Sequence, residues 1–159
     1  MDLSIRQATA NDFEALCELF EEVEAFHRKA LPHVFRKPEG REWIQEAVAA
    51  ATAGDDAVIF VAESGGRAVG LVHASIGCAP DLPIVVPRRY VMIHDLVVGK
   101  DFRRAGIGRA LVERVHEWAL ARDVAEVELN VWEFNKPALA LYEEMGYETT
   151  RRRMSKMLK

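Results

Sequence analysis

The 159-residue sequence has only two cysteines, Cys17 and Cys78. They stand far apart, and neither belongs to a paired Cys or His spacing of the kind that binds zinc or forms a redox motif. We interpret both as free thiols, and we expect a reducing compartment, the cytoplasm, and no metal site.

Long apolar runs are missing as well. The longest uninterrupted one is about Ala57 to Ala62, far short of the roughly 20 residues that cross a bilayer. The N-terminus also lacks a basic segment followed by an apolar one, which a secretory signal requires. We therefore expect neither secretion nor a membrane partner.

An excess of positive charge is the third absence. The chain carries 21 Lys and Arg against 25 Asp and Glu, a formal net charge of -4 at pH 7. Such a balance argues against binding of nucleic acid through bulk positive charge, so we expect no nucleic-acid partner.

What is present is the composition of one globular domain. Half of the residues are hydrophobic, and a chain near 150 residues buries roughly 68 to 70% of its unfolded surface. A core of that size needs neither disulfides nor a metal, and no repeat or low-complexity tract divides the chain. We therefore expect a single domain over residues 1–159.

Hydrophobic periodicity predicts the order of the elements. In the N-terminal part we expect a strand at Leu3–Gln7, a Thr9 N-cap, a helix whose apolar stripe runs from Phe13 to His27, a covering loop at Leu31–Pro38, and a helix over about Arg41–Ala53. The rest is predicted to form strands 57–62, 68–76, 90–98 and 124–131, helices 107–121 and 137–145, and one or two strands in the tail 147–158. This alternation predicts a mixed α/β sheet with helices on both faces.

The predicted strand 90–98 is apolar apart from His94 and Asp95. Such a run suits a central strand covered on both faces, where two adjacent polar side chains need a reason. Either they act in proton transfer, or Asp95 orients a neighbouring backbone group and His94 packs with a single hydrogen bond. Both interpretations stay open at this point.

Residues 96–109 lead from a strand end through a loop into a helix start, and this loop is suited to an anion. A helix N-terminus offers unpaired N–H groups, glycines let a ligand approach the backbone, and Arg103, Arg104 and Arg109 add charge. A P-loop is excluded because no Gly-Lys-Ser/Thr opens the helix. A dinucleotide fingerprint fits poorly because Leu111 stands where its third glycine belongs.

The remaining pattern, Arg-x-x-Gly-x-Gly at 103–108 after Leu-x-Val at 96–98, resembles the coenzyme A pyrophosphate loop of the GNAT family of N-acetyltransferases. The stretch from Arg6 to Asp12 is similar to the family's opening strand-to-helix junction. The stretch 135–147 is similar to its late helix motif, in which an Asn lies beside the cofactor and a Tyr near its sulfur. Lys100 departs from the family, because many relatives have proline there.

This resemblance implies the GNAT fold, a mostly antiparallel sheet with one parallel pair splayed at the cofactor site, and acetyl-CoA as cofactor. The backbone of 96–98 would pair with the pantetheine arm as another strand does. A bulge would splay this strand from 124–131 and free an N–H for the thioester carbonyl. The implied cofactor-binding residues are Leu96, Val97, Val98, Arg103, Arg104, Ala105, Gly106, Ile107, Gly108, Arg109 and Asn135.

The resemblance also implies direct transfer of an acetyl group to a primary amine in a ternary complex. An alkyl amine with a pKa of about 10.4 is only about one part in a thousand neutral at pH 7, so a base must remove its proton. His94 and Asp95 are the candidates, alone or through water, and the family pattern makes Tyr142 the general acid that protonates the thiolate. Cys17, in a core stripe, and Cys78, in a loop, are not expected to carry the acetyl group.

The acceptor, a small molecule or a peptide, is expected on the side of the first two helices. Glu24 and His27 are candidates to bind it, although a run of charge on a helix is also typical of a solvated face. Many relatives dimerise through their last strands, so the resemblance implies a homodimer. A non-catalytic acyl-CoA sensor or regulatory module is the alternative function, since it would need the cofactor loop but no acid or base.

Overall fold

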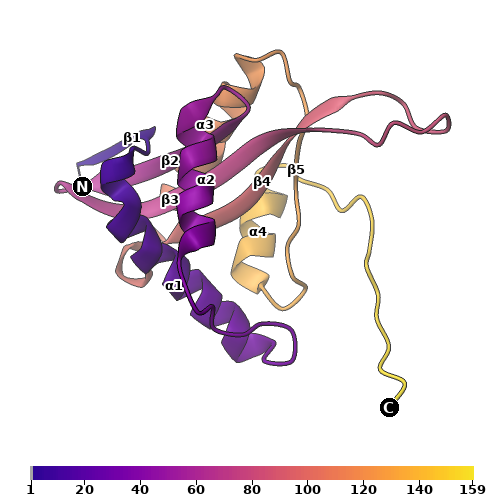
Figure 1. The fold of residues 1–159 in the computed structure, drawn as a ribbon, viewed down its shortest axis with the longest axis horizontal. Coiled ribbons are helices and arrows are strands. Elements are labelled where there is room, and N and C mark those ends of the chain that lie inside the picture. Colours follow the sequence, from indigo (N-terminus) through magenta and orange to yellow (C-terminus); the bar gives the residue numbers. More distant parts are fainter. Residues whose placement is uncertain (1) are drawn as a thin grey trace.

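The computed structural model describes residues 2–159, which form a five-stranded sheet in the order β1-β2-β3-β4-β5 (Figure 1). The strands are β1 (Leu3–Gln7), β2 (Ala57–Ser64), β3 (Arg67–Cys78), β4 (Arg89–Val98) and β5 (Val127–Leu129). The helices are α1 (Phe13–Ala30), α2 (Glu42–Ala53), α3 (Ile107–Leu120) and α4 (Lys136–Glu144), with 3-10 turns at Ala10–Asp12 and Lys100–Phe102.

The sheet is mixed, as predicted. Strands β1 to β4 pair antiparallel, each with its neighbour in sequence. Strand β5 runs parallel to β4 and pairs with it only where Val91–Ile93 faces Val127–Leu129. The short parallel pairing leaves the rest of β4 without a strand on that side within residues 2–159.

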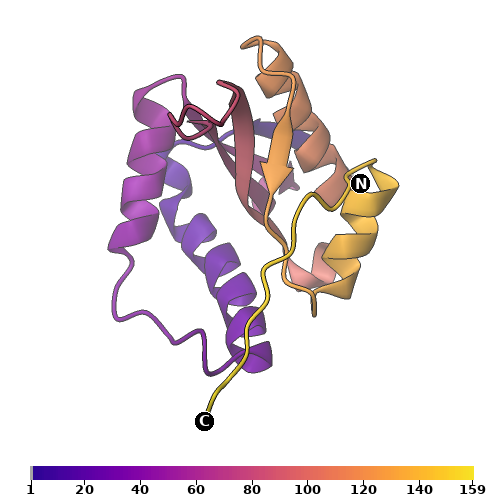
Figure 2. The same cartoon turned by 90° about the vertical axis from the view of Figure 1, so that its right-hand side faces the viewer.

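Helices cover both faces of the sheet, again as predicted (Figure 2). On one face α1 and α2 pack against alternate residues of the central strands; the fully buried Leu16 and Phe20 lie in this layer. On the other face α3 and α4 pack against the alternate set, with Leu111, Val115 and Trp118 in the core. Truncating a buried side chain of this kind costs about 2–5 kcal/mol, so both layers hold the sheet firmly.

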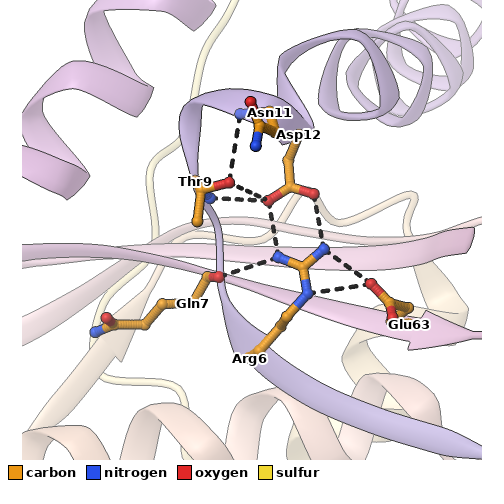
Figure 3. A network of polar contacts seen from close by, with 6 residues as sticks. All are labelled: Arg6, Gln7, Thr9, Asn11, Asp12 and Glu63. Atoms are coloured by element: carbon orange, nitrogen blue, oxygen red, sulfur yellow. Dashed lines mark hydrogen bonds and ion pairs between the residues drawn. The ribbon is translucent and has the colours of Figure 1, made fainter. Parts of the chain in front are cut away.

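The turn from β1 into α1 is held by a junction cluster, which we define as Arg6, Thr9, Asp12 and Glu63 (Figure 3). The two terminal nitrogens of Arg6 each donate to Asp12 at 2.8 Å, and Arg6 also donates to Glu63 of β2 at 2.8 Å. Thr9 and Asp12 form a reciprocal capping box around the helix start. The guanidinium of Arg6 and the backbone N–H of Thr9 hold the pKa of Asp12 below its usual value, with burial opposing them.

The predicted strand 124–131 is shorter in the structure, where it covers only Val127–Leu129. Helix α3 closes with Asp123 in the left-handed conformation at φ 58°, and the N–H of Val124 donates to the carbonyl of Ala119. This closure is a Schellman motif, which seats Val124 in the core below the helix instead of in the sheet.

The prediction of one or two strands in the tail 147–158 is wrong. Residues 148–159 form no strand and are exposed, including Met154, Met157 and Leu158. Figure 1 shows this segment running away from the body of the molecule. A strand forms only where another strand offers its edge, and the tail pairs with none within residues 2–159.

Within residues 2–159, no helix has both the length and the apolar stretch needed to span a membrane.

Candidate active site

Strand β4 carries a β-bulge at the two polar residues singled out from the sequence. His73 of β3 faces Asp95, and the next residue, Ala74, faces Ile93, so His94 is the extra residue. A bulge puts two consecutive side chains on one face of the sheet. His94 and Asp95 therefore both lie on the face of the sheet that carries His73. Their place in the bulge explains why two adjacent polar residues interrupt the apolar run of β4.

Four polar side chains meet at the bulge, and we call His73, Ser75, His94 and Asp95 the bulge cluster. The Nδ1 of His73 lies 3.2 Å from an Asp95 carboxylate oxygen, and the Oγ of Ser75 lies 2.6 Å from the Nε2 of His94. The two imidazole rings are 4.9 Å apart. Sequence reasoning missed His73 and Ser75, although their alternation with apolar Val72 and Ala74 is a signal for a shared polar face.

The surroundings of the bulge shift the pKa values of two side chains, His94 in the bulge cluster and Glu24 in α1. Partial burial lowers the pKa of His94, the nearby His73 lowers it further, and Asp95 raises it in part. Burial raises the pKa of Glu24, which projects from α1, and the carboxylates of Glu21 and Asp95 add to that effect. The lowered pKa keeps His94 neutral near pH 7. The charge of Asp95 contributes to the raised pKa of Glu24 in α1.

Tyr142 lies in α4 and is only 8% exposed. Burial raises its pKa well above the usual value, with further contributions from Tyr147 and from the charge of Asp95. Its ring meets that of Tyr147 edge to face at 5.5 Å, and the Tyr147 hydroxyl lies 2.7 Å from His116 Nε2. Tyr142 is thus a core residue whose phenol stays neutral, and the charge of Asp95 contributes to its raised pKa.

Beyond the bulge, β4 has a free edge. Its pairing with β5 ends at Ile93, so the following segment Asp95–Val98, which we call the open stretch, has no strand on that side within residues 2–159. Leu96 and Val98 pack toward α3, while Val97 points to the opposite core. Backbone groups along the open stretch are therefore available to an extended ligand.

A 3-10 turn at Lys100–Phe102 follows the open stretch, and after it comes the arginine loop, residues 103–109, which ends in the first turn of α3. Arg104 and Gly106 both have left-handed backbones, at φ 62° and 80°, and Arg103 to Gly106 are exposed. The first amides of any helix lack intrahelical acceptors, and Gly106 has no side chain that could accept from those of α3. This arrangement of left-handed residues before a helix N-terminus favours an anion.

Two arginines of this loop already have carboxylate neighbours. Arg103 donates to the carbonyl of Val98 at 3.0 Å and lies 3.8 Å from Glu22, and Arg109 lies 3.3 Å from Glu144. All of these pairs are largely exposed, so each contributes about 0–1 kcal/mol. The arginines are therefore free to exchange these partners for a more highly charged anion.

Two predicted cofactor residues have structural roles that the sequence did not separate. A Cβ on Gly108 would stand 3.3 Å from Leu141 of α4, so glycine at this position allows α3 and α4 to pack closely. The Asn135 side chain accepts a hydrogen bond from Ala138 N at 3.3 Å and caps α4. Contact of either residue with a cofactor stays a prediction.

The predicted acceptor residues, Glu24 and His27, both lie on α1, and the charge of Asp95 helps to raise the pKa of Glu24. Glu24 is 3.9 Å from Arg28. The His27 ring lies within a group of aromatic side chains, and its Nδ1–H donates to the carbonyl of Val23 at 2.7 Å. Phe35, from the predicted covering loop, contacts His27 at a ring distance of 5.6 Å, so the loop does pack over this end of α1.

Within residues 2–159, no group of three or more His, Cys, Asp or Glu side chains is arranged to hold a metal ion. Both cysteines are free; Cys17 is buried and Cys78 exposed.

Solved structures share this fold. A mutant form of a Bacillus halodurans protein superposes with a TM-score of 0.91 at 29% identity, covering 98% of this chain and 99% of that one. The aminoglycoside acetyltransferase AAC(6')-Iy, crystallised with the bisubstrate analogue CoA-S-monomethyl-acetylneamine, superposes with a TM-score of 0.79 at 18% identity, covering 100% of this chain and 99% of that one.

Sequence comparison points the same way. An uncharacterised N-acetyltransferase of Methanocaldococcus jannaschii is 30% identical over 91% of this chain, which spans 60% of that protein's length. An uncharacterised N-acetyltransferase of Bacillus subtilis is 26% identical over 92% of this chain and 90% of its own length. The sequence profile of the acetyltransferase (GNAT) family matches residues 16–147. The chain therefore belongs to the acetyltransferase (GNAT) family.

Proposed function

We propose that this domain is an acetyl-CoA-dependent N-acetyltransferase that moves an acetyl group directly to a primary amine. The observation that carries the proposal is the open stretch of β4, which leads through the short 3-10 turn Lys100–Phe102 to the arginine loop at the N-terminus of α3. An extended, amide-bearing arm ending in a diphosphate has the same order of parts. Family membership supports the reaction, and the AAC(6')-Iy structure with CoA supports the cofactor by its shared fold.

In this proposal the chain grips the cofactor mainly with its backbone. The open stretch pairs with the pantetheine arm, and the amides from Arg104 to Arg109 bind the diphosphate. When bound, the cofactor supplies an activated acetyl group and a thiolate leaving group. The exposed arginines exchange their surface carboxylates for phosphate oxygens, which present more charge and accept bidentate hydrogen bonds.

The bulge cluster would prepare the amine. We assign the base to His94, because its lowered pKa keeps the imidazole neutral and able to accept a proton near pH 7. Asp95 would bind the ammonium before deprotonation, since carboxylates bind ammonium ions by charge-assisted hydrogen bonds. His94→Gln should then lower kcat by about 100-fold, while Asp95→Asn should act mainly on the KM of the amine. The opposite split would assign the base to Asp95.

Tyr142 would hydrogen-bond the departing sulfur and supply its proton. Its raised pKa keeps the phenol protonated over the physiological range, so the proton is present when the thiolate forms. No cysteine is placed in this pathway, because Cys17 is buried in the α1 core layer.

The deciding experiment is a thiol-release assay with acetyl-CoA and a panel of amines that includes amino sugars, arylalkylamines, polyamines and a peptide. We expect turnover with at least one amine and kinetics of a ternary complex. Tight binding of CoA with no turnover for any amine would instead favour the acyl-CoA sensor. Ping-pong kinetics would contradict direct transfer.

We further propose that the protein is a homodimer in the cytoplasm. The exposed apolar side chains of the tail support an intermolecular contact, because nothing within residues 2–159 buries them, and the free cysteines suit a reducing compartment. Sedimentation of the protein should give twice the monomer mass, and Met154→Asp with Met157→Asp should reduce it to the monomer. Fractionation of cells should recover the protein with the cytosol.

A further inference from the structure

Five aromatic side chains form a continuous cluster outside both core layers; this aromatic cluster consists of Phe26, His27, Phe35, Trp132 and Phe134. His27 is the centre, with ring distances of 5.4 Å to Phe26, 5.6 Å to Phe35 and 5.7 Å to Phe134. Trp132 extends the cluster, 5.6 Å from Phe35. Nearly all of these contacts are edge to face, a favourable geometry for aromatic rings.

The cluster joins three segments that are distant in sequence: the end of α1, the loop after it, and the turn before α4. The two views agree that α1 ends near the turn before α4 (Figures 1 and 2). Because β4 and β5 are parallel with Ile93 beside Leu129, the residues just after Leu129 lie level with the open stretch. The aromatic cluster therefore stands beside the segment of β4 that follows the bulge.

Two rings of the cluster are left facing solvent. Phe26 is 41% exposed and Trp132 is 44% exposed. Neither belongs to the core clusters of residues 2–159, so packing of the fold does not account for them. The two are linked through His27 and Phe35, and exposed aromatic side chains gathered in one cluster are typical of a binding surface.

The charge next to these rings is negative. Glu24 lies on the same side of α1 as the buried Phe20, since the two are four residues apart, and it therefore faces the sheet. Asp95 projects from the bulge on the face of the sheet that α1 covers. Arg28 offsets part of this charge by contacting Glu21 at 2.7 Å and Glu24 at 3.9 Å. Asp95 has an imidazole as its side-chain partner and no arginine or lysine among residues 2–159.

We propose that the amine accepted at this site is an arylalkylamine, a primary ammonium joined by a short linker to a flat aromatic ring. The ammonium contacts Asp95 and Glu24, and the ring stacks on the exposed faces of Phe26 and Trp132. This inference rests on the N-acetyltransferase function proposed above, and it deepens that function by naming the acceptor. A polyhydroxylated amino sugar would leave its hydroxyl groups against apolar rings, where they lose hydrogen bonds to water.

The test compares phenethylamine, 2-cyclohexylethylamine and neamine as acceptors for acetyl-CoA. Phenethylamine and its saturated analogue share the ammonium and the linker, so their difference isolates the aromatic ring. We expect kcat/KM to favour phenethylamine by about 2- to 12-fold over the cyclohexyl compound, the range that one aromatic pair contributes. Neamine should be poorer than both.

Variants of the wild-type chain locate the effect. Phe26→Leu and Trp132→Leu should each raise the KM of phenethylamine by about 5- to 10-fold and leave the KM of acetyl-CoA unchanged. Phe26→Tyr keeps the ring and should bind as the wild type does. Phe13→Leu, at the other end of α1, is the matched control, and melting temperatures show whether each variant is folded.

A binding measurement keeps this inference separate from catalysis. Phenethylamine should quench the tryptophan fluorescence of the wild type, and Trp132→Leu should abolish the quenching. Quenching without turnover of any amine would leave the arylalkylamine site standing and overturn the N-acetyltransferase function. Turnover that favours neamine, with Phe26→Leu and Trp132→Leu unchanged, would overturn the arylalkylamine site and leave the N-acetyltransferase function standing.

Discussion

The junction cluster and the bulge cluster are both polar groups on the same sheet, yet they differ in how their charges are paired. In the junction cluster, Arg6 is bound by the carboxylates of Asp12 and Glu63, which raise the pKa of its guanidinium, and Arg6 in turn lowers the pKa of Asp12. The bulge cluster has two imidazoles and one carboxylate, with neither arginine nor lysine among its four residues. There the pKa of His94 is lowered, and this favours the neutral form of its imidazole.

The difference separates a polar group that stabilises the fold from one that can move a proton. A carboxylate locked to a guanidinium keeps its charge and cannot exchange protons near pH 7. An imidazole held neutral beside an incompletely paired carboxylate can accept one. We therefore expect changes in the junction cluster to alter stability, and changes at the bulge and around it to alter turnover.

The largest effect on turnover is expected at Tyr142, whose pKa is raised by burial and in part by the charge of Asp95. Tyr142→Phe should lower kcat by about 100-fold, because the departing thiolate loses its proton donor. Binding of CoA, measured by calorimetry, should change little. Tyr90→Phe, at the start of β4, is the matched control and should keep full turnover. Unchanged kcat in Tyr142→Phe would remove this residue from the mechanism.

A pair of matched substitutions tests the comparison directly. Asp95→Asn should raise the KM of the amine by about 10-fold, the loss of one charge-assisted hydrogen bond, and should leave the melting temperature nearly unchanged. Asp12→Asn should cost about 2 kcal/mol of stability, which lowers the melting temperature by roughly 4–8 °C, and should leave the KM of the amine unchanged. Equal losses of stability in the two variants would contradict the distinction.

Substitution of two glycines with positive φ tests whether the loop before α3 binds the cofactor. Gly106, at φ 80°, precedes α3, and Gly65, at φ 57°, lies in the β2–β3 turn; a Cβ on either would meet no atom within 4 Å. Substitution by alanine should strain both backbones by about 1 kcal/mol. Only Gly106→Ala should also weaken CoA binding, by about 5- to 10-fold, since strain there shifts the amides that bind the diphosphate. Equal affinity in the two variants would argue against that site.

The smallest effect is the acid dependence of stability that Asp12 contributes. Its pKa in the folded protein lies below the ordinary 3.8, chiefly because Arg6 donates hydrogen bonds to it. The resulting stabilisation is present above pH 3.8 and is lost as the pH falls through the lower, folded-state value. Melting curves from pH 6 to pH 2 should show the wild type losing its advantage over Asp12→Asn in this acid range. A constant difference between the two would show that Asp12 does not act through its charge.

Much of the local structure follows from the sequence. The Thr9 cap and the stripe of α1 through Leu16 and Phe20 were predicted and are present, because capping and helical periodicity involve residues within one or two turns of each other. His94 and Asp95 also stood out, as polar residues in an apolar run. The position of the bulge did not, because it depends on the pairing of β4 with β3.

Part of the site was beyond sequence reasoning for a related reason. His73 and Ser75 approach the bulge from another strand, and Phe35 and Trp132 meet although they are almost a hundred positions apart. One or two strands were also predicted in the tail, and that prediction was wrong because a strand forms only where another strand offers its edge.

The sequence by itself determined the family, the order of helices and strands, the arginine loop, and the two polar residues of β4. These are properties of neighbouring residues, whose spacing sets capping, amphipathicity and turn geometry. Only the tertiary structure decided which partners those residues meet: the imidazole beside Asp95, the free edge after Ile93, and the rings that gather around His27. Such contacts arise when distant segments are brought together by burial of the two core layers, and spacing along the chain carries no record of them.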